Sequence, residues 1–127
     1  MSNSPGPREL ISHRVNGLNE VIRITAFDDE GQKACHRYRV WPANGKALGS
    51  VIEFQRGPLR GDGGVPNGLS NEALLAIIED RLEFFQASDL SCIENEQALN
   101  HVRGALHWLK KRTEMRVARG VEGTMER

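Results

Sequence analysis

Apolar residues recur at helical spacing through the C-terminal half of the chain, and this pattern constrains the fold more than any other feature. The first run occupies residues 70–86 and the second runs from about 94 to 119. Small and polar residues interrupt the pattern at 87–91, where a turn is expected. Two helices separated by so short a turn are expected to pack as an antiparallel hairpin.

Residues that favour helix ends mark the limits of both runs. Ser70 is a favoured N-cap residue, and Glu72 places an acid in the first turn, where it meets the positive end of the helix dipole. Gly120 is a natural terminator for the second helix. These signals predict a helical hairpin over residues 69–119.

Three short segments rich in β-branched and aromatic residues precede the helices, at 21–27, 37–41 and 51–55. Joined by short turns, they predict an antiparallel sheet that is too small to bury its apolar face alone, so we expect the helices to cover it. The predicted fold class is α+β: a short N-terminal antiparallel β-sheet followed by a long two-helix antiparallel hairpin. The expected layout is a single domain (1–127) with a flexible N-terminus (1–17), a β region (18–57), the helical hairpin (69–119) and a tail (120–127).

Charge and cysteine usage narrow the functional class. Lys+Arg and Asp+Glu both number 17, so the formal net charge is zero, which argues against a general nucleic-acid coat but leaves room for a local basic site. Cys35 and Cys92 match no metal or redox spacing. The chain has no apolar run long enough for a membrane span and no apolar signal-peptide core, so a cytoplasmic protein is expected.

Three arginines share one face at the end of the second helix, because Arg112, Arg116 and Arg119 are spaced four and three residues apart. They form either a clamp for phosphate or a set of cations favoured by the helix dipole. Two of them continue a heptad-like stripe, whose other members are Asn95, Ala98, Val102, Ala105 and Leu109. Arginines on a buried stripe need anionic partners, either from this chain or from a bound anion.

The length of the hairpin suggests an oligomer. Phe85 closes the first helix and Asn95 opens the second, so both lie near the tip. Arg112 follows Asn95 by almost five turns, about 25 Å along the axis. One small ligand cannot touch both ends within one chain, whereas a second, antiparallel copy could bring the tip of one hairpin beside the arginines of the other.

Catalytic and metal motifs are not recognisable. The four histidines, His13, His36, His101 and His107, form neither a nucleophile arrangement nor a His-x-x-x-His metal pair. We therefore expect no catalytic residues, no metal site and no cofactor.

Two stretches resemble a family of small bacteriophage proteins, the hairpin-domain anti-defence proteins. Residues 67–86 are similar to its first helix, and residues 94–124, which end in Arg-Val-Ala-Arg-Gly-Val-Glu-Gly-Thr, are similar to its second helix and tail. Members of the family are nucleotide sponges that counter the bacterial Thoeris and CBASS immune systems. The resemblance implies a non-enzymatic protein in the infected host's cytoplasm that holds cyclic ADP-ribose isomers without hydrolysis.

The resemblance also implies site residues and assembly. Phe85 would stack on adenine, Asn95 would pair with its edge, and Arg112 and Arg116 would hold phosphates. Arg60, the basic residue after the Gly-Pro of the third strand, would be a further ligand-binding residue. Some members also bind cyclic di- or trinucleotides at separate sites in a hexamer. The candidates for such a second site are Arg119, Gly123 and Thr124. The assembly would be a dimer, or a hexamer built as a trimer of dimers.

Plainer interpretations remain for each residue. Phe85 can be a core residue, Asn95 a polar residue of a first helical turn, and Arg60 an exposed loop cation; Arg119 can cap the helix, bind a ligand or face water. Two other functions also remain open. The first is a small regulator that binds nucleic acid through the basic helix end, and the second is a hydrolase of cyclic nucleotides.

Overall fold

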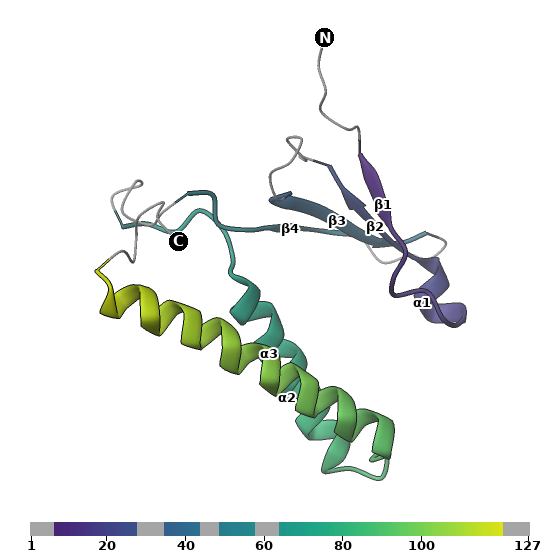
Figure 1. Cartoon of the computed structure of the whole chain (residues 1–127). Helices are drawn as coiled ribbons and strands as arrows, with labels where there is room; N and C mark the ends of the chain where they lie inside the picture. The colour runs from purple at the N-terminus through teal and green to yellow at the C-terminus, as the bar shows by residue number, and fades with distance from the viewer. Residues whose placement is uncertain (1–6, 28–34, 44–48, 58–63, 121–127) are drawn as a thin grey trace. The chain divides into compact units, whose positions relative to one another are not determined.

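A computed structural model describes residues 7–27, 35–43, 49–57 and 64–120 (Figure 1). The chain divides into two compact units, residues 1–56 and 57–127. The first holds β1 (Arg8–Leu10), α1 (Gly17–Val21), β2 (Ile22–Ala26), β3 (Arg37–Pro42) and β4 (Ser50–Glu53), and the second holds α2 (Asn71–Gln86) and α3 (Ile93–Ala118). The α+β fold class is confirmed, and that the chain is a single domain stays a prediction.

The sheet has the order β1-β2-β3-β4, and every neighbouring pair is antiparallel. The three predicted strands correspond to β2, β3 and β4. The structure adds β1, in a stretch expected to be mobile, and α1, in a stretch without a clear pattern. Asn16-Gly17 reads as a turn in the sequence, but Asn16 instead caps α1, because its side-chain oxygen accepts a hydrogen bond from the Asn19 amide at 3.0 Å.

The two faces of the sheet differ in chemistry because side chains alternate along each strand. One face is apolar, and its register places Leu10 beside Ile24 and Ile24 beside Val40. On this face Tyr38 and Phe54 make an edge-to-face contact, with ring centroids 5.7 Å apart. The other face carries three arginines and two aromatic rings; we call it the arginine–aromatic face and define it by Arg23, Phe27, Arg37, Arg39 and Trp41.

A close approach beside β3 requires glycine at position 49. A Cβ atom on Gly49 would lie 2.5 Å from the Cβ of Trp41 and 2.8 Å from the Val40 carbonyl oxygen. Any side chain at this position would therefore push the start of β4 away from β3.

The hairpin helices are capped as the sequence predicts. The Ser70 hydroxyl oxygen accepts a hydrogen bond from the Ala73 amide at 3.0 Å. Gly120, which follows the last turn of α3, has φ +75°, a conformation that favours glycine. At the tip, the Cys92 amide donates to the Gln86 side-chain oxygen at 3.1 Å, which ties the connection to the end of α2.

Very few of the described residues are buried within one chain. They are Ala26, Cys35, Leu99 and Arg116. Large apolar side chains are exposed on the hairpin instead, among them Ile78 at 45%, Phe84 at 70% and Trp108 at 69%. These exposed side chains leave much apolar surface available for a partner.

Among the described residues, no helix combines the length and apolar character needed to cross a bilayer.

Candidate functional site

The less exposed side chains of α3 define which side of it faces α2. They follow a regular alternation of four- and three-residue steps, and we call them the contact row: Asn95, Leu99, Val102, Leu106, Leu109, Thr113 and Arg116. This row corrects the stripe that the sequence suggests, because Ala98, Ala105 and Arg112 are exposed. The two series run side by side, and the leucines of the contact row have more apolar area to bury than the alanines.

The two arginines therefore differ. Arg116 lies on the contact row with 8% of its surface exposed, and it already makes an interaction within the chain. Arg112 is exposed, and within the described part of the chain it makes no ion pair. The expectation that both continue a buried face is wrong for Arg112 and right for Arg116. An exposed guanidinium without a carboxylate keeps all its N–H donors available to an anion.

Phe85 lies near the C-terminal end of α2 and is half-buried. The guanidinium carbon of Arg81 lies 5.4 Å from the centroid of its ring, one helical turn earlier. A cation so placed is attracted by the ring and leaves a positive charge beside a surface suited to stacking. Sequence reasoning did not select Arg81 as a site residue, although its spacing of four residues from Phe85 is a signal that could have identified it.

Asn95 is half-buried in the first turn of α3. Its backbone amide donates to the Cys92 sulfur at 3.4 Å, which makes Cys92 the N-cap of α3. Its side-chain nitrogen donates weakly to the Leu90 carbonyl oxygen at 3.5 Å. Among the described residues, nothing donates a hydrogen bond to the side-chain oxygen of Asn95, which therefore remains an acceptor at the hairpin tip.

Four predicted site residues remain: Arg119, Arg60, Gly123 and Thr124. Arg119 is exposed and forms the C-cap of α3, where it already makes an interaction within the chain. Arg60, Gly123 and Thr124 lie outside the described residues. The site can therefore be built only from the tip of the hairpin and from the last turns of α3.

These two ends lie on the same side of the hairpin. At about 100° per residue, Leu74, Ile78 and Phe85 share one strip of α2. A matching strip of α3 holds Ala98, Ala105 and Leu109, and Arg112 borders it at one end. We call these two strips the apolar face. Because α3 runs uninterrupted from Ile93 to Ala118, Phe85 and Arg112 lie at opposite ends of this face and cannot meet within one chain.

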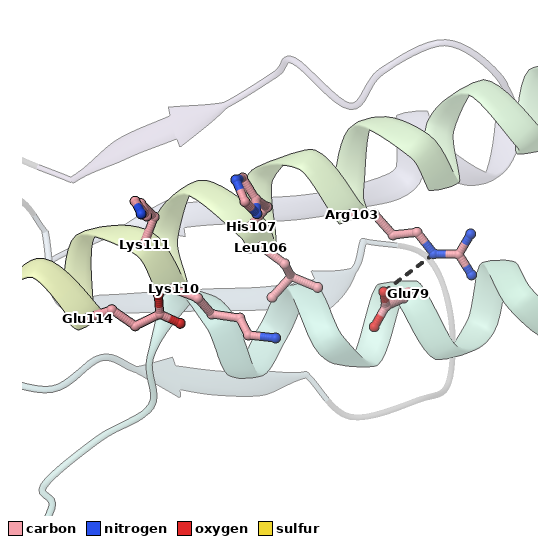
Figure 2. A pocket seen from close by; sticks show the side chains of 7 residues that line it. All are labelled: Glu79, Arg103, Leu106, His107, Lys110, Lys111 and Glu114. Carbon is pink, nitrogen blue, oxygen red and sulfur yellow. Dashed lines mark ion pairs between the residues drawn. The ribbon is translucent and has the colours of Figure 1, made fainter.

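A charged groove lies on the opposite side of the contact row, with a volume of about 340 Å³ (Figure 2). It is lined by Leu106 and by six charged or polar side chains: Glu79, Arg103, His107, Lys110, Lys111 and Glu114. Arg103 links the helices there, with its Nε 3.6 Å from Glu79 and its Nη2 3.0 Å from Glu83. The groove contains none of the predicted site residues, so its main visible role is to hold α2 and α3 together.

The segment that contains most of the hairpin is also the part of the chain that matches a known family. Residues 49–114, just over half of the chain, match the family model described as the Acb2/Tad1 hairpin domain. A relative named Thoeris anti-defense 1, from Bacillus phage SBSphiJ7, is 45% identical over 78 residues. The match covers 61% of this chain and 54% of the relative, so the chain spans about half the length of the relative.

Proposed function

Because the chain belongs to the Acb2/Tad1 hairpin-domain family, we propose that it counters a bacterial anti-phage defence by binding a nucleotide signal and holding it intact. The signals are of the cyclic ADP-ribose type, made by Thoeris sensors. The observation that supports this most is the hairpin itself. It presents Phe85 with Arg81 at one end of an apolar face and, at the other end, Arg112, which makes no ion pair with any described residue.

The side chains at the two ends suit the parts of such a ligand. The Phe85 ring can stack on adenine, an interaction that contributes about 1–3 kcal/mol per base. The Asn95 amide can pair with an adenine edge through its donor and its acceptor. Arg112 can hold a phosphate with paired, charge-assisted hydrogen bonds. Arg116, which is buried and already makes an interaction within the chain, is the proposed contact for the second phosphate.

A second copy would complete the site. Two hairpins packed antiparallel through their apolar faces would place Phe85 and Asn95 of one beside Arg112 of the other. Such packing would also cover Ile78, which is 45% exposed in the single chain. We propose a two-fold dimer as the minimal binding unit, either alone or within a hexamer built as a trimer of dimers.

Release of intact ligand tests the proposal. The protein is incubated with cyclic ADP-ribose and its isomers, separated from free ligand and denatured by heat, and the released compound is identified by mass spectrometry. A ligand of unchanged mass is the expected result. A ligand that has gained water would identify a hydrolase instead, and no retained ligand would contradict the proposal.

Arg112 offers a matched pair of variants for this assay. Arg112→Gln is expected to weaken retention by about tenfold or more, since a charged hydrogen bond contributes roughly 1.5–3 kcal/mol. Lys111→Gln also removes one positive charge from α3, but on the side of the charged groove, and should retain the ligand. Equal loss in both variants would indicate a general charge effect and would argue against a site at Arg112.

A second nucleotide site is a separate part of the proposal. Arg119, with Gly123 and Thr124 of the tail, is the candidate set for a cyclic di- or trinucleotide. The same release assay with a cyclic trinucleotide tests it, with Arg119→Gln as the variant. Retention of the trinucleotide that is independent of Arg119 would remove this residue from the site.

A further inference from the structure

The arginine–aromatic face of the sheet, in the N-terminal unit, is a second concentration of anion-binding chemistry. Its composition follows from the strand register. Arg23 of β2 lies opposite Trp41 of β3, and Arg39 lies opposite Thr25. All four side chains therefore point to the same side of the sheet.

Two of the three arginines of this face are held by carboxylates. Arg37 Nε lies 3.2 Å from Glu53 Oε1, an ion pair without hydrogen-bond geometry, and its guanidinium lies 4.6 Å from the Phe27 ring centroid. Arg23 donates to Glu9, a carboxylate that also accepts from Arg14 at 2.9 Å. These arginines are committed to the cross-strand ion pairs of the sheet.

Arg39 is different. It is exposed, it makes no ion pair with any described residue, and its guanidinium lies 4.5 Å from the centroid of the Trp41 ring. The ring restricts where the guanidinium can lie while using none of its N–H donors. A guanidinium positioned in this way can bind an oxyanion with two parallel hydrogen bonds.

The neighbours of Arg39 strengthen the site. Thr25 lies opposite it on β2 and offers a hydroxyl that makes no side-chain hydrogen bond among the described residues. The three arginines of this face outnumber its two described carboxylates, Glu9 and Glu53, and this excess of positive charge favours an anion over a cation.

We propose that the arginine–aromatic face binds the phosphate group of a nucleotide through Arg39, with Thr25 as a second donor. The site lies in the N-terminal unit, and its central residues precede residue 49, so it is outside the segment that matches the hairpin family. It does not depend on the proposed function of the hairpin.

Trp41 makes the site directly observable. The chain has two tryptophans, and Trp108→Phe leaves Trp41 as the only indole. In this background we titrate ADP, inorganic pyrophosphate and adenosine and follow the emission of Trp41. ADP and pyrophosphate are expected to change the emission in a salt-sensitive manner, whereas adenosine, which has no phosphate, is expected to leave it unchanged.

Substitutions at Arg39 test the mechanism. Arg39→Gln should weaken ADP binding by about tenfold or more, because it removes the charge-assisted hydrogen bonds. Arg39→Lys keeps the charge but loses the planar fork, so an intermediate affinity is expected. Arg8→Gln is the matched control, because Arg8 lies opposite Ala26 and points to the other face of the sheet.

Three results would overturn the proposal. They are an unchanged emission up to millimolar ADP and pyrophosphate, an equal response in Arg39→Gln, or a response to adenosine as large as that to ADP. Phe85→Ala should leave the Trp41 response intact, and Arg39→Gln should leave hairpin sequestration intact. The two proposals can therefore fail separately.

Discussion

At the residue scale, Arg112 and Arg116 lie one turn apart on α3 and meet different surroundings. Arg116 is buried on the contact row, whereas Arg112 is exposed beside it. The sequence places both arginines at this end of the helix. Spacing alone, however, cannot decide whether the series that includes Ala105 or the neighbouring series that includes Leu106 faces α2. The difference is decided by the apolar area that each series buries against α2, and this depends on tertiary packing.

Phe85 gives a prediction at this scale. Phe85→Ala should weaken retention of a cyclic ADP-ribose-type ligand by about tenfold or more, because base stacking contributes about 1–3 kcal/mol. The neighbouring Phe84 is 70% exposed and lies outside the apolar face, so Phe84→Ala should retain the ligand. Isothermal titration of both variants measures the difference. If Phe85→Ala binds like the original protein, Phe85 is a packing residue only.

At the element scale, the sequence predicts the helices far better than the start of the sheet. α2 and α3 are long, periodic and capped, so local signals agree with the final structure. β1 has only three residues, too few to show an alternating pattern. Its position depends on pairing with β2 and on the hydrogen bonds that Glu9 accepts from Arg14 and Arg23. No local sequence pattern reveals these interactions.

The N-cap of α2 provides a prediction for the hairpin. Ser70→Ala removes the acceptor for the Ala73 amide and should lower the free energy of unfolding by about 0.5–2 kcal/mol. Ser91→Ala is the matched control, since the Ser91 hydroxyl makes no hydrogen bond among the described residues. Urea denaturation of both variants measures the effect, and equal stability would show that the cap contributes nothing.

Glu9 provides a pH-dependent prediction for β1. The hydrogen bond from Arg23 lowers the pKa of the Glu9 carboxyl below its ordinary value, and the charge of Arg14 acts in the same direction. A carboxyl with a lowered pKa stabilises the folded state above its ordinary pKa, and this contribution is lost as the pH falls through the lowered value. The protection factors of the β2 amides, which compare their exchange with that of an unstructured chain at the same pH, should therefore fall in acid.

Two substitutions isolate the contribution of Glu9. Glu9→Gln should remove this part of the acid dependence, so that the protection factors of the β2 amides change less between neutral and acid pH. Glu20→Gln should preserve it, because Glu20 is exposed and makes no ion pair with any described residue. An identical pH profile for all three proteins would contradict a role for Glu9.

At the scale of the whole molecule, many large apolar side chains are exposed and few of the described ones are buried. Only three of the described apolar residues are buried, and Ile78 of the apolar face is 45% exposed. A binding site divided between the two ends of this face cannot be recognised from one copy, because its parts come together only across an interface. The sequence therefore provides candidate residues for the proposed site but not its shape.

Assembly through the apolar face leads to the last prediction. Light scattering at micromolar concentration should show a dimer or a multiple of it. Ile78→Lys should convert it to monomer, because two lysines would then face each other across the two-fold axis. Val15→Lys, at an apolar residue that is 79% exposed in the other unit, should leave the assembly intact. A monomeric original protein would exclude the shared site.

The short connection between Gln86 and Ile93 also affects how soon the protein can act after synthesis. It makes the contacts between α2 and α3 local in sequence, and proteins dominated by such contacts fold within microseconds to milliseconds. The hairpin needs no slow long-range pairing before its two helices meet. For the proposed dimer, the time from translation to a binding-competent state during an infection would then be limited by the encounter of two copies. That time would therefore depend on the amount of protein made.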